Sequence, residues 1–298
     1  ISFELVLEMA AVFGGKVNWY YEEEDRMLFF EDKIGISDLW HAFIPSGSDY
    51  REEEIGYKNV EGNQLGSWVA QLTYDHKDFS ISIYADHFFE DHSAIYHLGY
   101  YGYGVDGDWQ KRNRRLYLYP LKDGQLGLDV RLKKQRYLKN FVVEFMNTMY
   151  QSGPVYHDHT INVYDQIGGR DNYYNHTYYP GWQYYGQVIG NPLFRSPIYN
   201  EDASLEIKNN RFFAWHIGLD GYLSSDWSYR MFASWQKGFG TYHKPLDKSQ
   251  ENLSMMLETE YDLSSKIKGL SIRAAYGFDK GGLLGDNQGM QMSLILRR

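Results

Sequence analysis

Hydrophobic and polar residues alternate with a period of two in several long segments of the chain. In residues 67–75, for example, Trp68, Ala70, Leu72 and Tyr74 share one parity, and polar residues fill most of the other. Such alternation predicts β-strands with one apolar face. The pattern recurs in residues 1–13, 67–75, 79–86, 125–132, 141–146, 213–220, 227–236, 253–262, 270–278 and 290–297. Between residues 14 and 60 the alternation is less clear.

The length of these segments favours strands that cross a bilayer. The longer ones run for roughly 9–13 residues, whereas an ordinary globular strand has about 5–6 and a tilted membrane strand needs about 9–11. Their apolar parity is also graded, since Trp68 and Tyr74 bracket Ala70 and Leu72. Aromatic rings at both ends of a strand are typical of the girdles of membrane barrels. A soluble β-sandwich, whose strands also alternate, is the alternative.

The connections between these segments alternate in length, as they do in barrels with short turns on one side and long loops on the other. We therefore predict a single domain, residues 1–298, that forms an all-β, transmembrane, antiparallel up-and-down β-barrel with long external loops. The last strand should end on the side of the short turns. Short connections are expected at residues 75–78, 133–136, 223–226 and 264–268, and long ones at about 89–124, 151–210, 239–251 and 280–288.

Composition narrows the class of protein. The 28 Tyr, 16 Phe and 8 Trp make up 17% of the chain, and there is no Cys. No stretch of 18 apolar residues exists, which excludes a helical membrane protein. The net charge of −9, with both signs mixed, argues against a nucleic-acid partner. Because Ile1 and Arg298 both lie within strand-like runs, we expect truncation at both ends.

Two aromatic segments, residues 96–109 and 171–186, combine rings with Asn, Asp and Gln side chains. Rings stack on sugar faces while amides and carboxylates bond the hydroxyl groups, so these segments predict a glycan site. Packing of the rings against one another is the alternative. A basic run at 111–115 suits an acidic polysaccharide or a lipopolysaccharide phosphate, with a solvated loop as the alternative. The candidate contacts are Tyr100, Tyr101, Tyr103, Trp109, Arg112, Arg114, Arg115, Tyr173, Tyr174, Tyr178, Tyr179, Trp182 and Tyr185.

The sequence gives little support to a selective channel, a metal site or an enzyme. The polar parity of the strands mixes acids and bases, which predicts an ion-pair network in the wall more than a selective channel. Neither Asp86-His87 with Asp91-His92 nor His157-Asp158-His159 supplies four metal ligands, so no metal or other cofactor is expected. No nucleophile motif is present, and an enzyme is not expected.

Several motifs resemble the Wzi-type capsule assembly proteins of Bacteroides-like bacteria. They are residues 87–93 (HFFEDHS), 168–175 (GGRDNYYN), Gly181-Trp182 and 188–193 (VIGNPL). The resemblance covers about residues 65–298. It implies an outer-membrane barrel, with 16–18 strands in the intact protein, that binds or retains capsular or other surface polysaccharide beside membrane lipid and lipopolysaccharide. A porin or solute channel, or a barrel subunit bound to other envelope proteins, is the alternative function.

Overall fold

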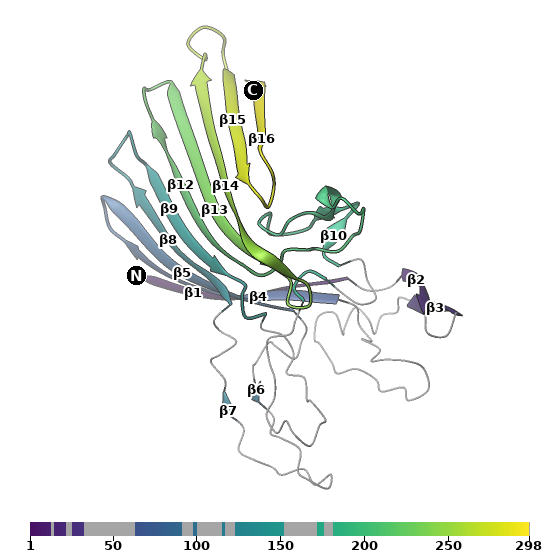
Figure 1. Ribbon diagram of the computed structural model, residues 1–298. Helices are drawn as coiled ribbons and strands as arrows, with labels where there is room; N and C mark the ends of the chain where they lie inside the picture. Colours follow the sequence, from purple (N-terminus) through teal and green to yellow (C-terminus); the bar gives the residue numbers. More distant parts are fainter. Residues whose placement is uncertain are drawn as a thin grey trace.

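Ten strands form one antiparallel sheet in the computed structural model, which describes residues 1–12, 15–21, 26–32, 63–90, 98–99, 115–116, 123–151, 172–175 and 181–297 (Figure 1). Strands that follow one another in the sheet also follow one another along the chain. The strands are β1 (Ser2–Val12), β4 (Asn63–Asp75), β5 (Phe79–Glu90), β8 (Gly124–Leu132), β9 (Asn140–Asn147), β12 (Phe212–Tyr222), β13 (Trp227–Gly240), β14 (Pro245–Asp262), β15 (Leu270–Gly281) and β16 (Asn287–Leu296).

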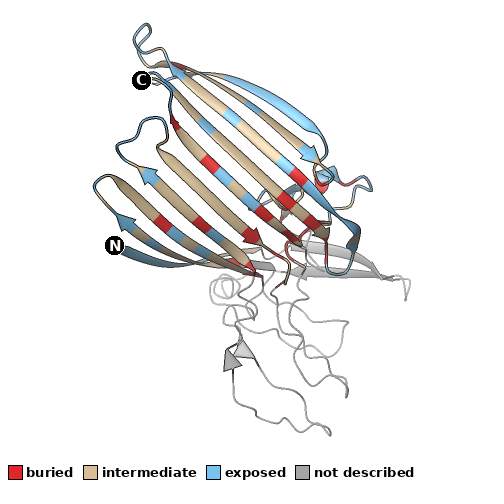
Figure 2. Cartoon of the chain, turned by 60° about the vertical axis from the view of Figure 1, so that its left-hand side comes forward, coloured by how far each residue is buried: buried red, intermediate tan, exposed pale blue. Residues whose placement is uncertain are grey.

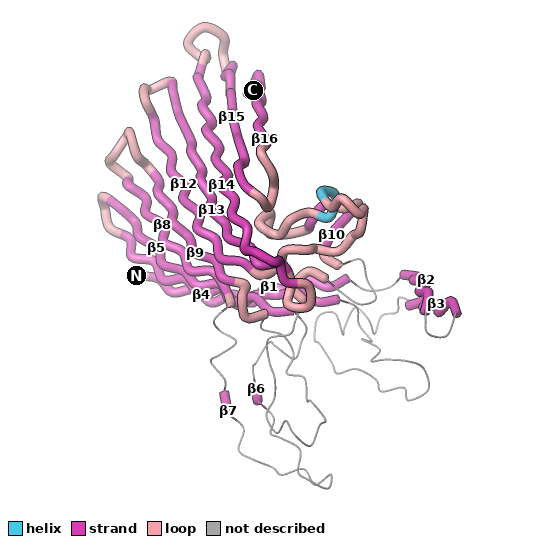
Figure 3. Tube along the Cα trace, in the orientation of Figure 1, coloured by secondary structure: helices cyan, strands magenta, loops and turns pink. Residues whose placement is uncertain are grey.

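Small elements accompany this sheet. Three further antiparallel pairs each contain two strands, and the one helical element among the described residues is a single 3-10 turn, drawn in cyan in Figure 3. They are β2 (Gly15–Tyr21) with β3 (Arg26–Asp32), β6 (Leu98–Gly99) with β7 (Arg115–Leu116), β10 (Gln183–Tyr184) with β11 (Gln187–Val188), and the turn η4 (Pro197–Tyr199). No helix within the described ranges is long and apolar enough to cross a membrane.

The predicted all-β meander is confirmed, because each of the ten alternating segments forms one strand of the sheet. The described strands build an open, curved sheet with β1 and β16 at its edges, and no closed ring is seen among them (Figure 1). Alternation fixes which face of a strand is apolar, and neighbouring strands then align like faces.

The short connections lie where they were predicted, and the last strand ends beside them. Leu296 pairs with Leu270, the residue that follows the turn between β14 and β15. The long loop predicted at 239–251 is wrong: β13 and β14 extend into this range and are joined by residues 241–244 alone. The connection predicted at 280–288 is also shorter in the structure, where residues 282–286 join β15 to β16. In both hairpins the backbone ladder continues after the apolar pattern has ended.

The sheet has one apolar and one polar face. The cross-strand register places apolar residues in a continuous row over nine strands: Phe3, Leu72, Ile83, Leu128, Val143, Ile217, Ala233, Met255 and Phe278. We call the face of the sheet that carries this row the outer face. Figure 2 shows exposed positions spread over the sheet. The exposed large apolar side chains of the outer face are Phe3, Leu5, Leu7, Leu72, Tyr74, Ile83, Leu126, Trp215, Ile217, Trp227, Leu253, Leu257, Tyr261, Tyr276, Met290, Met292, Leu294 and Leu296.

The opposite, inner face carries a hydrogen-bonded network. Arg273 donates to Glu260 through Nε (3.0 Å) and Nη2 (2.7 Å), and Arg230 pairs with Glu258 at 2.9 Å. Further along, Asn140 donates to both carboxylate oxygens of Asp220. Partners lie on neighbouring strands, so the network links the wall laterally, as the mixed charges of this parity predicted.

Candidate functional site

A loop lobe, residues 172–175 and 181–211, packs on the inner face of the sheet. Its hydrophobic core joins the lobe to side chains of β9 and β12. The ring of Phe194 links the two, because it stacks on Tyr174 with ring centroids 3.9 Å apart and meets Phe212 edge-on at 5.1 Å. The buried members are Met146, Tyr173, Tyr174, Trp182, Phe194, Ile207, Phe212 and Ala214.

Three of the predicted glycan contacts belong to this core. Tyr173 is 2% exposed, and Tyr174 and Trp182 are each 5% exposed. A buried ring offers no face to a sugar, so the assignment of these three residues as surface contacts is corrected, and the alternative that the rings pack against one another holds for them. Tyr173 donates its hydroxyl to Asp123 Oδ2 at 2.9 Å. Burial raises the pKa of the Tyr174 hydroxyl, which accepts from the backbone N–H of Asn191.

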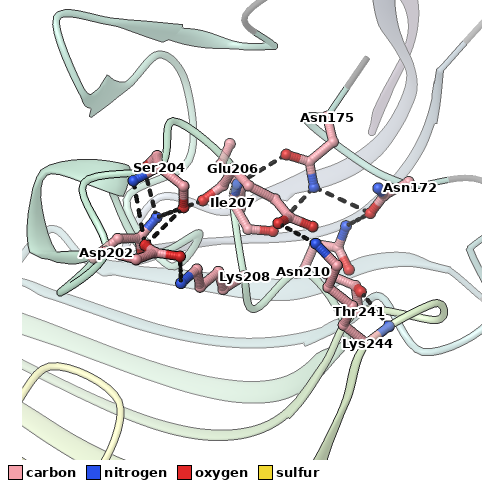
Figure 4. Close-up of polar contacts among 11 residues, drawn as sticks. Asn172, Asn175, Asp202, Ser204, Glu206, Ile207, Lys208, Asn210, Thr241 and Lys244 are labelled. Atoms are coloured by element: carbon pink, nitrogen blue, oxygen red, sulfur yellow. Dashed lines mark hydrogen bonds and ion pairs between the residues drawn. The ribbon is translucent and has the colours of Figure 1, made fainter. Parts of the chain in front are cut away.

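Asparagine side chains hold the lobe together (Figure 4). Asn175 pairs with Ile207 as a neighbouring strand would: its Nδ2 donates to the Ile207 carbonyl (2.9 Å), and its Oδ1 accepts from the Ile207 N–H (2.8 Å). Asn210 Nδ2 donates to Asn172 Oδ1 (2.6 Å) and to the Tyr173 carbonyl (2.9 Å). These amides satisfy buried backbone groups, as irregular backbone requires. They are therefore structural and do not serve as sugar ligands.

Two residues at the end of β9 fasten the lobe to the sheet. Gln151, fully buried, donates to the Asn210 carbonyl at 3.1 Å and accepts from the Tyr173 N–H at 3.0 Å. Thr148 Oγ1 donates to the same Asn210 carbonyl at 2.7 Å. At this point, directly after β9, the lobe is attached to the sheet through uncharged groups.

Two tyrosines remain on the surface of the lobe. Tyr184 is 68% exposed and Tyr185 is 85% exposed, and their rings meet edge-on with centroids 4.6 Å apart. Tyr185 and Gly186 form the two-residue turn between β10 and β11, with φ of 48° and 79°. Both central residues of a type I′ turn need positive φ, and a bulky side chain there costs about 1–2 kcal/mol. Such a cost at an exposed ring motivates a hypothesis of function, although Gln151, Tyr174 and Ala203 also have positive φ.

The 3-10 turn η4 lies against this hairpin and extends its aromatic surface. The Ile198 N–H donates to the Gly186 carbonyl at 2.8 Å, and a Cβ at Gly186 would lie 3.3 Å from Ile198. Tyr199 is exposed, and its carbonyl accepts from Arg195 Nη2 at 2.7 Å. We call Tyr184, Tyr185, Ile198 and Tyr199 the ring surface.

Paired charges border the lobe (Figure 4). Lys208 Nζ lies 2.7 Å from Asp202 Oδ2, and the hydrogen bonds from Lys208 and Ser204 lower the pKa of the Asp202 carboxyl to about 2. Lys244 Nζ lies 2.7 Å from Glu206 Oε2, which raises the pKa of Lys244. Because each cation already has an anion, these pairs add no net charge that would select an acidic or a basic ligand.

Nine further contacts were predicted. Arg115 opens β7, and the rest lie outside the described residues: Tyr100, Tyr101, Tyr103, Trp109, Arg112, Arg114, Tyr178 and Tyr179. Tyr184 and Tyr199 were not among the predicted contacts. The signal for Tyr184 was the pair Gly181 and Gly186, both at positive φ, which bracket the hairpin.

Within the described ranges, no group of three or more His, Asp and Glu side chains could hold a metal ion. No family model, curated protein or solved structure matches the chain.

Proposed function

We propose that the sheet is part of the wall of an outer-membrane β-barrel and that its outer face contacts lipid. The supporting observation is the apolar outer face, whose exposed side chains extend across the sheet from Phe3 on β1 to Leu294 on β16. Soluble proteins rarely expose a contiguous apolar patch larger than a few hundred Å². Acyl chains are the solvent that suits such a surface, and each of the eight strands between β1 and β16 is hydrogen-bonded to a neighbour on both sides.

A soluble sandwich fits this arrangement poorly. It would cover the apolar face with a second layer and leave the polar face in water. Here the loop lobe packs on the polar, inner face, through Met146 and Ala214, while the outer face stays open. The polar groups are therefore turned toward the protein interior and the apolar groups away from it, which is the order found in membrane barrels.

Within this barrel, the ring surface is proposed to bind surface or capsular polysaccharide. Tyrosine suits this task because its ring covers the apolar face of a sugar and its hydroxyl bonds to the polar edge, while only two torsions become fixed. Tyr184 and Tyr185 are held on a hairpin braced by a buried core, so little order is lost on binding. The resemblance to capsule assembly proteins supports the same role, and no catalytic step is proposed.

Removing both rings tests this function. The double variant Tyr184→Ala, Tyr185→Ala should reduce affinity for a retained polysaccharide at least tenfold, which corresponds to about 1.4 kcal/mol, because two stacking faces are lost. Binding is measured with the detergent-purified full chain on an array of bacterial surface polysaccharides, followed by titration of the glycan retained.

Tyr137→Ala is the matched control. Tyr137 is 68% exposed, as is Tyr184, but lies in the short turn between β8 and β9 at the other end of the sheet. Its removal should leave the affinity unchanged. Retention of no polysaccharide by the unaltered chain, or equal retention by the double variant, contradicts the proposal.

A further inference from the structure

The turns at one end of the sheet are basic, although the chain as a whole is acidic. They join β4 to β5, β8 to β9, β12 to β13 and β14 to β15, and they follow one another along that end (Figure 1). We call residues 76–78, 133–139, 223–226 and 263–269 the turn rim. The turn rim holds seven basic residues and two acidic ones, whereas the net charge of the whole chain is −9. Such a local excess of positive charge attracts an anionic neighbour.

Most cations of the turn rim have no acidic partner. Lys133 pairs with Asp75 at 2.5 Å, and Lys134 pairs with Asp78. In the part of the chain that the structure describes, no carboxylate lies within 4.0 Å of the other five basic side chains of the turn rim: Lys77, Arg136, Lys139, Lys266 and Lys268. The positive charge of the turn rim is therefore not neutralised within the sheet.

The opposite end of the sheet shows no such excess. At the turn rim the excess remains when Asp75, Asp262 and Arg297 at the adjoining strand ends are counted, since eight basic residues then face four acidic ones. At the other end of β13 to β16, residues 237–251 and 279–288 together contain four lysines and four acidic residues. The basic charge is thus concentrated at one end of the strands and is not a general property of the sheet.

Exposed rings mark the boundary between the outer face and the turn rim. Tyr74, Trp227 and Tyr261 belong to the outer face, are 43–47% exposed and lie within two residues of a turn of the rim. Rings that are partly apolar and partly polar favour the headgroup level of a membrane. Lysine side chains just beyond this level can extend their ammonium groups to the lipid phosphates.

We infer that the turn rim binds the headgroups of anionic phospholipids, such as phosphatidylglycerol, in the leaflet beside it. Each lysine or arginine close to an anionic membrane surface adds to the attraction, and the phosphate oxygens accept hydrogen bonds from both kinds of side chain. Lipid headgroups are favoured over an acidic protein because the turn rim continues directly from the apolar outer face. The inference rests on the proposed membrane wall, since the headgroups are within reach only where the outer face contacts lipid.

Electron paramagnetic resonance of spin-labelled lipids tests this inference with the full chain folded into phosphatidylcholine vesicles. Labelled phosphatidylcholine and labelled phosphatidylglycerol each report the fraction of lipid that the protein immobilises. Phosphatidylglycerol should be preferred at least about twofold, because one basic residue favours an anionic lipid about fivefold at its own position and the balanced end of the sheet dilutes this effect. In about 1 M salt the preference should disappear, because charges at the surface are then screened within about 3 Å.

Replacing unpaired cations locates the site. The variant Lys266→Gln, Lys268→Gln removes two charges from the turn between β14 and β15 and should lower the preference for phosphatidylglycerol. Adding Lys77→Gln and Arg136→Gln should remove most of what remains. All four side chains are exposed, so the fold should be kept.

The matched control is Lys248→Gln, Lys280→Gln, which removes two exposed lysines from the opposite end of β14 and β15 and should leave the preference unchanged. A preference that high salt leaves intact, or an equal loss in the control variant, would overturn the inference. Equal immobilisation of both lipids would also overturn it, while lipid contact by the outer face would stand. Absence of any immobilised lipid would refute the membrane wall and this inference with it, so the two failures are distinguishable.

Discussion

Replacing Leu257 by Arg measures whether the outer face lies in hydrocarbon. Leu257 is 52% exposed on β14 and lies four residues from Tyr261, whose ring meets Trp227 at the end of the sheet with the short turns. Four residues at about 3.3 Å each give about 13 Å along the strand, or about 10 Å of depth for a strand tilted by about 40°. An apolar band is about 25 Å tall, so this position is close to its middle.

At that depth an arginine should destabilise the barrel by about 2–4 kcal/mol, whereas near the interface the cost falls to about 0–1 kcal/mol. Leu223→Arg provides the interface comparison, because Leu223 is 49% exposed but begins the short turn between β12 and β13. Unfolding free energies are measured by denaturant titration of protein folded into lipid vesicles, followed by tryptophan emission.

Equal losses of unfolding free energy in the two variants would contradict lipid contact at the outer face. On a surface in water, both substitutions should change stability by no more than about 0.5 kcal/mol, since surface substitutions away from special features rarely do more. A difference below about 1 kcal/mol between Leu257→Arg and Leu223→Arg would therefore remove the argument for lipid contact.

Two further predictions concern the loop lobe. The pKa of Asp202 should be about 2, because Lys208 and Ser204 bond its carboxylate. These contacts should stabilise the lobe fully above the ordinary pKa of 3.8, and the stabilisation should be lost as the pH falls through about 2. An NMR titration of the carboxyl carbon with a midpoint near 3.8 would contradict this prediction. Asn175→Ala leaves the N–H and carbonyl of Ile207 without their partners, which should lower the local opening free energy by about 1–3 kcal/mol. Hydrogen exchange at Ile207 should then accelerate about tenfold or more while amides of β13 keep their rates, and unchanged exchange at Ile207 would refute this role.

The strands could be predicted because apolar residues occupy alternate positions in every one of them. Residues 227–236, for instance, gave β13 its first ten positions. The ends of β13 and β14 could not be predicted in the same way, because Gly238, Gly240 and the polar start of β14 lack apolar alternation. Pairing between the two strands extends beyond the apolar pattern, through Gly238 with Gln250 and, after a register shift, Gly240 with Pro245.

The candidate site was harder to predict because loops have no repeating period. Trp182 and Tyr185 are three residues apart, yet one is buried and the other is the most exposed ring of the lobe. The buried position depends on groups distant in sequence, such as Asp123, which accepts from Tyr173 fifty residues later. Composition indicated that rings would matter in this segment, but only the packing separates core rings from surface rings.

The amide contacts of the lobe have a consequence for its response to salt. Asn175, Asn210 and Gln151 carry no charge, so dissolved ions do not screen their hydrogen bonds. The charged pairs at the border, Asp202 with Lys208 and Glu206 with Lys244, are partly exposed and weaken as salt screens them. At high salt the lobe should therefore loosen at its border first, while the hairpin that carries Tyr184 and Tyr185 keeps its position.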